Sequence, residues 1–276
     1  MKPASTNRLM AEHGFTLMEL LVAMFSAIVV LGGILATLEF TLQQQSRVTD
    51  RVDADQIGRG AMAKIVEELR SSCTGFEAHA IQGPSETPAS PLASTGPVNL
   101  WFVSAYGNSN SGNALIKEVV EHDVNWTETG KSNTGERIGT LRDYRFASTA
   151  GSATEGWTFP SLTSQEVEKA KASARILASN VIPPVVTGKT ETPTIFQYYK
   201  YQNNATSLTN GELVSMSASE VPSAAKAGEI AKVAIAFTQA PSSGDTRNDR
   251  TASLSGSIVL RFTPTESESD ENTPCH

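Results

Sequence analysis

The charged residue with the clearest chemical implication in this 276-residue chain is Glu19, which stands at the start of a long apolar run. Residues 20–38, LLVAMFSAIVVLGGILATL, contain no charged side chain, and Glu19 and Glu39 close the run at its two ends. A charge inside a bilayer costs about 2.5 to 3.5 kcal/mol on insertion scales, and such residues usually have a partner. The chemistry expected of Glu19 is therefore neutralisation of a cation in the same apolar setting.

The apolar run is long enough to cross a membrane once as a helix. At 1.5 Å rise per residue it spans about 28 Å, close to the ~30 Å hydrocarbon core of a bilayer. Lys2 and Arg8 precede it, which predicts that this end stays in the cytoplasm and that the rest of the chain is exported. A secretory signal peptide is the alternative, but its apolar core is typically shorter and needs no carboxylate at its head.

The apolar run follows directly on a six-residue motif, Gly14-Phe15-Thr16-Leu17-Met18-Glu19. This motif resembles the processing site of type IV prepilins and type II secretion pseudopilins. The resemblance implies that prepilin peptidase removes the leader 1–14 by cutting between Gly14 and Phe15, and that Phe15 is then N-methylated. It also implies that Glu19 acts in subunit assembly, as counter-ion to the amino terminus of a neighbouring subunit.

The resemblance further implies a set of partners and a location. The partners are prepilin peptidase, other pilin or pseudopilin subunits, the inner-membrane assembly platform and membrane lipid. The location is the inner membrane, crossed once, with the C-terminal domain in the periplasm or outside and at a filament tip after assembly. The same N-terminal device serves secretion, adhesion-type pili and DNA uptake, so the motif does not choose among these machines.

The size of the exported part favours a minor subunit over a major one. Three softer patterns resemble the J-type minor pseudopilin and the W-type minor pilin: ILASNV at 176–181, FQYY at 196–199 and VLRF at 259–262. The segment Glu67-Glu68-Leu69-Arg70 also resembles theirs. The implied function is to initiate or cap a type II secretion pseudopilus or a type IV pilus.

The predicted fold is α+β, with a long pilin-like helix packed on an antiparallel sheet. The helix is expected over residues 15–75, spanning the membrane at about 20–38, because the apolar positions 57, 61, 65 and 69 recur every four residues. A β-rich domain is expected over 76–264, and the acidic tail 265–276 should be flexible. Alternating patterns predict strands at seven places: 98–105, 114–124, 138–147, 175–182, 194–201, 229–239 and 253–263. The last two should form an antiparallel hairpin.

The supply of catalytic groups is thin, so no enzyme activity and no cofactor are predicted. The chain has four histidines, and it contains no HExxH, GxSxG or P-loop pattern. Its formal charge of −7 and the lack of a Lys/Arg cluster argue against nucleic acid as a partner. A periplasmic enzyme using His79 or His122 is one alternative. A single-span, membrane-anchored periplasmic binding protein is the other.

Two further groups of residues could form sites. Asp245, Asn248 and Asp249 could offer oxygens to calcium, but their spacing matches no EF-hand loop, which favours a plain polar hairpin tip. Cys73 and Cys275 are the two cysteines, and in an oxidising periplasm they could form one disulfide or stay as free thiols. Two cysteines are too few for a structural zinc site of the cysteine-rich type.

Overall fold

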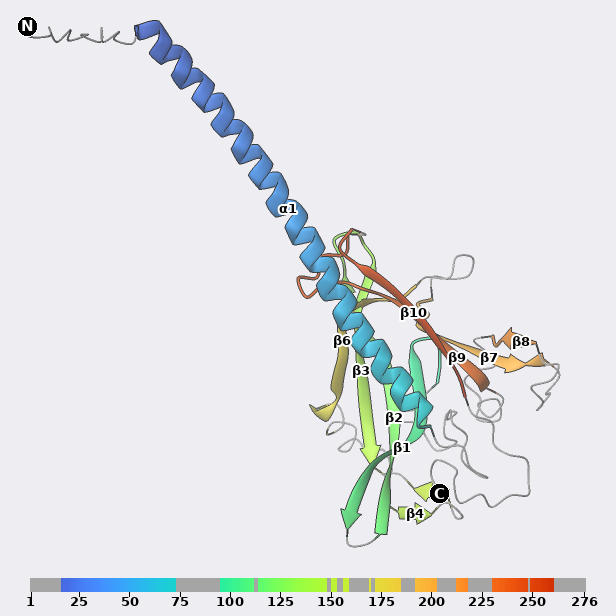
Figure 1. Ribbon diagram of the computed structural model, residues 1–276. Helices are drawn as coiled ribbons and strands as arrows, with labels where there is room; N and C mark the ends of the chain where they lie inside the picture. The colour runs from blue at the N-terminus through green and yellow to red at the C-terminus, as the bar shows by residue number, and fades with distance from the viewer. Residues whose placement is uncertain are drawn as a thin grey trace, which may run out of the picture. The chain divides into compact units, whose positions relative to one another are not determined.

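The computed structural model describes residues 16–72, 95–111, 114–147, 150–152, 156–158, 169, 172–184, 192–202, 212–217, 230–247 and 249–260. The chain forms two units, Met1–Val48 and Thr49–His276. One continuous helix, α1 (Leu17–Arg70), begins in the first unit and ends in the second (Figure 1). The α+β class predicted from the sequence is confirmed.

In the first unit, the described residues form the apolar part of α1. Its large apolar side chains from Leu17 to Leu42 are between 54% and 81% exposed, so no other described part of the chain covers them. The helix is long and apolar enough to cross a membrane, which is a statement of length and composition alone. Because contiguous apolar surface of this extent is rare on soluble monomers, it marks an interaction surface.

The second unit is built on a curled antiparallel sheet of eight strands. The strands are β1 (Asn99–Ser111), β2 (Ala114–Lys131), β3 (Arg137–Ala147), β6 (Arg175–Ile182), β7 (Phe196–Tyr201), β8 (Leu213–Ser215), β9 (Ile230–Gln239) and β10 (Ala252–Val259). They lie in the order β1-β2-β3-β6-β9-β7-β8, and β10 pairs with β9. A separate small hairpin joins β4 (Ala150–Ser152) and β5 (Gly156–Thr158).

Strand β9 is the centre of the sheet because it pairs with three other strands. Along one edge it pairs with β10 from Lys232 to Gln239. Its other edge is shared by β7 and by the end of β6, where Val181 lies opposite Gln239. Val233, Ile235 and Phe237 of β9 alternate into the core as predicted.

The second part of α1 packs across one face of this sheet (Figure 1). Its buried residues recur every three or four positions, which places them on one stripe of the helix: Ala54, Gly58, Ala61, Ile65, Glu68 and Leu69. The stripe meets β9 and β10 near Gly58 and reaches β2 and β3 at Glu68. Small residues at its beginning let the helix backbone approach the strands closely.

The predicted strands are confirmed, with corrected bounds. The strand expected at 114–124 continues to Lys131, because residues past Val124 still pair with β3. Strands β4, β5 and β8 have three residues each and were not predicted, since so short a segment shows no alternating pattern. The helix ends at Arg70, not at 75, and is followed by a turn.

Two predicted segments, the leader 1–14 and the tail 265–276, lie outside the described residues. Ile258 and Leu260 are buried as the strand pattern predicted.

Gly58 provides a test of the contact between helix and sheet. A Cβ at this position would overlap Leu254 Cδ1 and lie 3.2 Å from Gln239 Cβ, whereas a Cβ at Gly60 would meet nothing within 4 Å. We therefore expect Gly58→Ala to lower the free energy of unfolding by about 1 to 2 kcal/mol through overpacking. Gly60→Ala, the matched control, should raise it by up to about 1 kcal/mol through helix propensity. Denaturant unfolding of both variants checks this, and equal effects would contradict it.

Candidate functional site

Glu19 lies in the first turn of α1, where it forms a capping box with Thr16. Glu19 Oε2 accepts hydrogen bonds from the Thr16 backbone N–H (3.1 Å) and from Thr16 Oγ1 (3.0 Å). In return, the Glu19 backbone N–H donates to Thr16 Oγ1 at 3.3 Å. Such reciprocal bonds satisfy backbone donors that a helix start leaves unpaired. Glu19 therefore starts the helix as well as carrying a charge.

The other atom of this carboxylate, Oε1, has no hydrogen bond among the described residues. It is available to a cation from outside the helix. Gly14 and Phe15, the predicted cleavage site, lie outside the described residues, so the capping box is the first element after that site. The predicted role of Glu19 in assembly is compatible with this geometry but is not tested by it.

The structure describes only part of the predicted calcium site and none of the predicted disulfide. Cys73 and Cys275 lie outside the described residues, and so does Asn248. Asp245 accepts hydrogen bonds from the Arg247 backbone N–H (3.1 Å) and from its Nε (3.0 Å), and Arg250 Nε lies 3.4 Å away. These hydrogen bonds, chiefly from Arg247, lower the pKa of Asp245 to about 2. The Asp245 carboxylate thus has arginine partners, and calcium binding there stays a prediction.

A buried polar cluster that was not predicted lies where the end of α1 meets the sheet. We call it the Glu68 cluster, and its members come from four elements: Glu68 of α1, His122 of β2, Asp143 of β3 and Arg175 of β6. The side chains of Glu68, His122 and Asp143 are at most 1% exposed. Asp143 and Arg175 lie directly opposite each other in the pairing of β3 with β6. The sheet register therefore positions two of the four groups, and the helix adds the third charge.

The distances within the Glu68 cluster are those of hydrogen bonds and ion pairs. Arg175 Nη2 donates to Glu68 Oε1 and to Asp143 Oδ2, each at 2.8 Å. His122 Nδ1 lies 3.0 Å from Asp143 Oδ1 and 3.5 Å from Glu68 Oε2. Lys64 Nζ adds a second positive charge 3.6 Å from Glu68 Oε1. The two buried carboxylates are thus held between an arginine, a lysine and an imidazole.

The imidazole of His122 is fixed by stacking. Its ring lies parallel to that of Phe102, with 4.9 Å between the centroids and 8° between the planes. Phe102 and His122 are direct partners in the pairing of β1 with β2, so the register creates this stack. The stack fixes the plane of the ring, and within that plane Nδ1 faces the two carboxylates.

The opposite face of β2 buries two more carboxyl groups, Glu121 and Asp123. They alternate with His122 along the strand and are 5% and 1% exposed. Burial raises the pKa of Glu121 to about 7, partly offset by a hydrogen bond from Trp101. Burial, and then repulsion from Glu121 and Asp143, raises the pKa of Asp123 well above its usual range. Neither Asp123 oxygen has a hydrogen-bond partner in the described part of the chain. Burial therefore favours the neutral form of Asp123.

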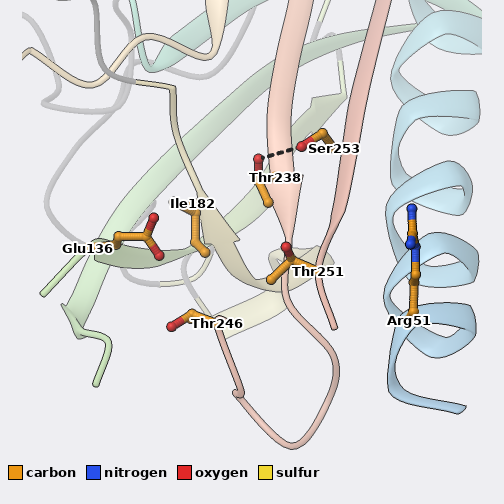
Figure 2. A pocket seen from close by; sticks show the side chains of 7 residues that line it. All are labelled: Arg51, Glu136, Ile182, Thr238, Thr246, Thr251 and Ser253. Carbon is orange, nitrogen blue, oxygen red and sulfur yellow. Dashed lines mark hydrogen bonds between the residues drawn. The ribbon is translucent and has the colours of Figure 1, made fainter. Parts of the chain in front are cut away.

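A polar pocket of about 460 Å³ lies between α1 and the edge of the sheet where β9 and β10 meet (Figure 2). It is lined by Ile182, by two charged residues, Arg51 and Glu136, and by four side chains with hydroxyl groups. The four hydroxyl residues are Thr238, Thr246, Thr251 and Ser253. Figure 2 shows Arg51 and Glu136 at opposite ends of the pocket. The hydroxyls could hydrogen-bond a small polar ligand, but none of the residues that line the pocket is a histidine or a cysteine.

Comparison with known proteins identifies no relative. No protein-family model, no curated protein and no solved structure matches this chain. Its function therefore has to be inferred from its own residues and their geometry.

Sequence reasoning missed the Glu68 cluster because its members are scattered along the chain. Glu68 and Arg175 lie 107 positions apart, and no motif links them. The available signals were a histidine at a core-facing position of a strand and a glutamate on the buried stripe of the helix. Polar residues at such positions usually have partners, because burying an unpaired charge is costly.

Arg175 should be important for stability because it contacts both buried carboxylates. We expect Arg175→Met to lower the free energy of unfolding by about 3 kcal/mol, since two buried negative charges lose a shared partner. The matched control is Arg59→Met, because Arg59 pairs with Asp55 on the helix surface at 2.7 Å and should contribute less than about 1 kcal/mol. Chemical denaturation at pH 7 measures both. Equal losses would mean that the cluster is not a stabilising ion network.

Glu121 should make stability depend on pH. Its unfolded carboxyl has the ordinary pKa of 4.5 and the folded one about 7, so the unfolded chain loses its proton first as pH rises. The contribution of Glu121 to the free energy of unfolding is therefore greatest below pH 4.5, and it is lost as the pH rises to 7. We expect Glu121→Gln to match the wild type near pH 4 and to be more stable at pH 8 by up to about 3 kcal/mol.

The control for this experiment is Glu136→Gln, because Glu136 is exposed. It should change the free energy of unfolding by less than about 0.5 kcal/mol at either pH. Unfolding curves recorded from pH 4 to 8 decide the matter. If Glu121→Gln raised the free energy of unfolding by the same amount at pH 4 and at pH 8, the pKa of Glu121 would not be raised in the folded protein.

Proposed function

We propose that this protein is a minor subunit of a type IV pilin-like filament, which helps to initiate or cap a type II secretion pseudopilus or a type IV pilus. The observation that carries the proposal is the division of α1 into an exposed apolar part and a part packed on the sheet. One uninterrupted helix begins at Leu17, inside the GFTLME motif, exposes an apolar first part, and packs its second part on an antiparallel sheet. The motif and this helix are independent observations that favour the same function.

In this proposal, prepilin peptidase cuts between Gly14 and Phe15 and methylates the new amino terminus. The apolar segment from Phe15 to Leu38 first lies in the inner membrane as a single span. During assembly it leaves the lipid and packs against the helices of other subunits, so its apolar surface stays out of water throughout. The β-rich domain stands on the periplasmic side and forms part of a tip complex.

Glu19 has two roles in this proposal, and each of its two carboxylate oxygens serves one of them. Oε2 accepts the two hydrogen bonds from Thr16, which fixes the start of the helix. Oε1 is left to receive the amino terminus of a neighbouring subunit, and the pair of opposite charges is cheaper in an apolar filament core than either charge alone. The carboxylate can therefore cap its own helix and neutralise a neighbour at the same time.

A second candidate function is supported by the polar pocket between Arg51 and Glu136. A membrane-anchored periplasmic binding protein would use the hydroxyls of this pocket to hold a small polar ligand. Such a protein needs no cleavage after Gly14, so retention of residues 1–14 would favour it. We regard the assembly function as the better supported because the pocket does not explain the GFTLME motif.

Variants of Glu19 and Thr16 distinguish charge from capping. Glu19→Gln keeps an acceptor for the Thr16 hydrogen bonds but removes the charge, Thr16→Ala removes half of the capping box but keeps the charge, and Glu19→Ala removes both. We expect all three to insert into the membrane and be cleaved. Incorporation into filaments should fall at least about tenfold for both Glu19 variants, since an unpaired amino terminus costs more than 1.4 kcal/mol in an apolar core.

Thr16→Ala should assemble nearly normally, because a lost cap costs only about 1 kcal/mol of helix stability. The measurements are carbonate extraction for insertion, peptide mass for cleavage and immunoblotting of purified filaments for incorporation. Gly14→Trp supplies the uncleaved reference. Normal incorporation of Glu19→Gln would contradict the charge-neutralisation role.

A further inference from the structure

The Glu68 cluster contains three metal-ligating groups that the assembly function does not use. One ligand atom from each of Glu68, His122 and Asp143 can be chosen so that all three lie within 4.8 Å of one another. All three side chains are buried, and they come from α1, β2 and β3. We propose that these three residues bind a divalent transition-metal ion of the Zn²⁺ type, which ties the end of α1 to the sheet. This inference is independent of the proposed assembly function.

The distances in the cluster fit a metal ion. Zn²⁺ binds histidine nitrogen and carboxylate oxygen at about 2.0 to 2.2 Å, so neighbouring ligand atoms lie about 3 to 3.6 Å apart around it. His122 Nδ1 is 3.0 Å from Asp143 Oδ1 and 3.5 Å from Glu68 Oε2. Two of the three ligand separations are therefore already those of a metal site. One oxygen of each carboxylate and a ring nitrogen of His122 lie within 4.8 Å of one another.

The hydrogen bonds leave the inward-facing oxygens for the metal. Arg175 donates to Glu68 Oε1 and Asp143 Oδ2, which are not the oxygens that approach His122. Partners of this kind, one layer outside the ligands, commonly hold metal-binding carboxylates in position. Phe102, stacked on His122, fixes the plane of the third ligand in the same way. The site is thus oriented before any ion arrives.

A proton on His122 Nδ1 is the simpler alternative, and it leaves Glu68 Oε2 and His122 Nε2 without hydrogen-bond partners in the described chain. A single N–H at Nδ1 can donate to Asp143 Oδ1 at 3.0 Å, but Glu68 Oε2, at 3.5 Å, then has no hydrogen-bond partner in the described chain. Glu68 is 1% exposed, so water does not solvate that oxygen freely. A buried acceptor without a partner is costly. A metal ion contacts both oxygens and the nitrogen at once.

The donor set selects the class of metal. Imidazole with two carboxylates suits Zn²⁺, Mn²⁺, Fe²⁺ or Ni²⁺, whereas Ca²⁺ takes six to eight oxygens and Mg²⁺ demands an octahedron of oxygens. The two carboxylates supply the negative charge that faces the ion, and Arg175 and Lys64 beside them reduce the net negative charge of the site. Because the three ligands come from separate elements, the expected effect of binding is greater resistance to unfolding.

The test uses the full chain, extracted from its membrane in detergent, stripped of metal with EDTA and then supplied with Zn²⁺ alone. We expect about one zinc ion per chain by elemental analysis after dialysis. We also expect the unfolding temperature to rise by about 5 °C when free zinc exceeds the dissociation constant about a hundredfold. Absence of bound zinc from the wild-type chain would overturn the proposal, whatever the variants do.

Matched variants locate the zinc. Glu68→Gln and Asp143→Asn keep the shape of the ligands but should weaken zinc binding at least about tenfold and abolish the shift in unfolding temperature. Glu67→Gln, at the exposed neighbouring position, and His79→Ala should bind zinc like the wild type. Wild-type affinity in both Glu68→Gln and Asp143→Asn would place the ion elsewhere and overturn the proposal. If those two variants fail to fold, the stoichiometry and temperature shift of the wild type decide.

Discussion

An apolar helix surface that no described part of the chain covers is the constraint on which the rest of this structure depends. From Leu17 to Leu42 the large apolar side chains of α1 are more than half exposed, and water is a poor solvent for them. A partner from outside the described residues would have to keep this surface out of water. The sheet packs on a later part of α1, through one stripe of residues from Ala54 to Leu69.

The sheet around that stripe buries carboxyl groups as well as apolar side chains. On its two faces, the free-energy cost of burying these groups is met in different ways. On the face toward α1, Glu68 and Asp143 are compensated by Arg175, with His122 beside them. On the other face of β2, Glu121 and Asp123 have no such cation among the described residues, and burial raises their pKa. The first arrangement ties helix to sheet through ionic contacts, and the second makes the stability of the sheet sensitive to pH.

Local sequence patterns predicted most of the helix and strands. They did not predict the contacts between residues that are far apart in the sequence. Alternating residues such as Val233, Ile235 and Phe237 marked a core strand correctly, because the period of a strand is visible in a few neighbouring positions. The Glu68 cluster was not predictable, because Asp143 meets Arg175 only through the register of β3 with β6. Glu19 was identified from its place before the apolar run, but its capping bonds to Thr16 became visible only in the structure.

The central claim is that this chain is processed as a prepilin and assembles through its apolar helix. The mass of the N-terminal peptide, measured on protein purified from its own membrane, tests the claim most directly. The account predicts a peptide that begins at N-methylated Phe15. A peptide that begins at Met1, or one that begins after the apolar run, would contradict it and reduce the GFTLME motif to a coincidence.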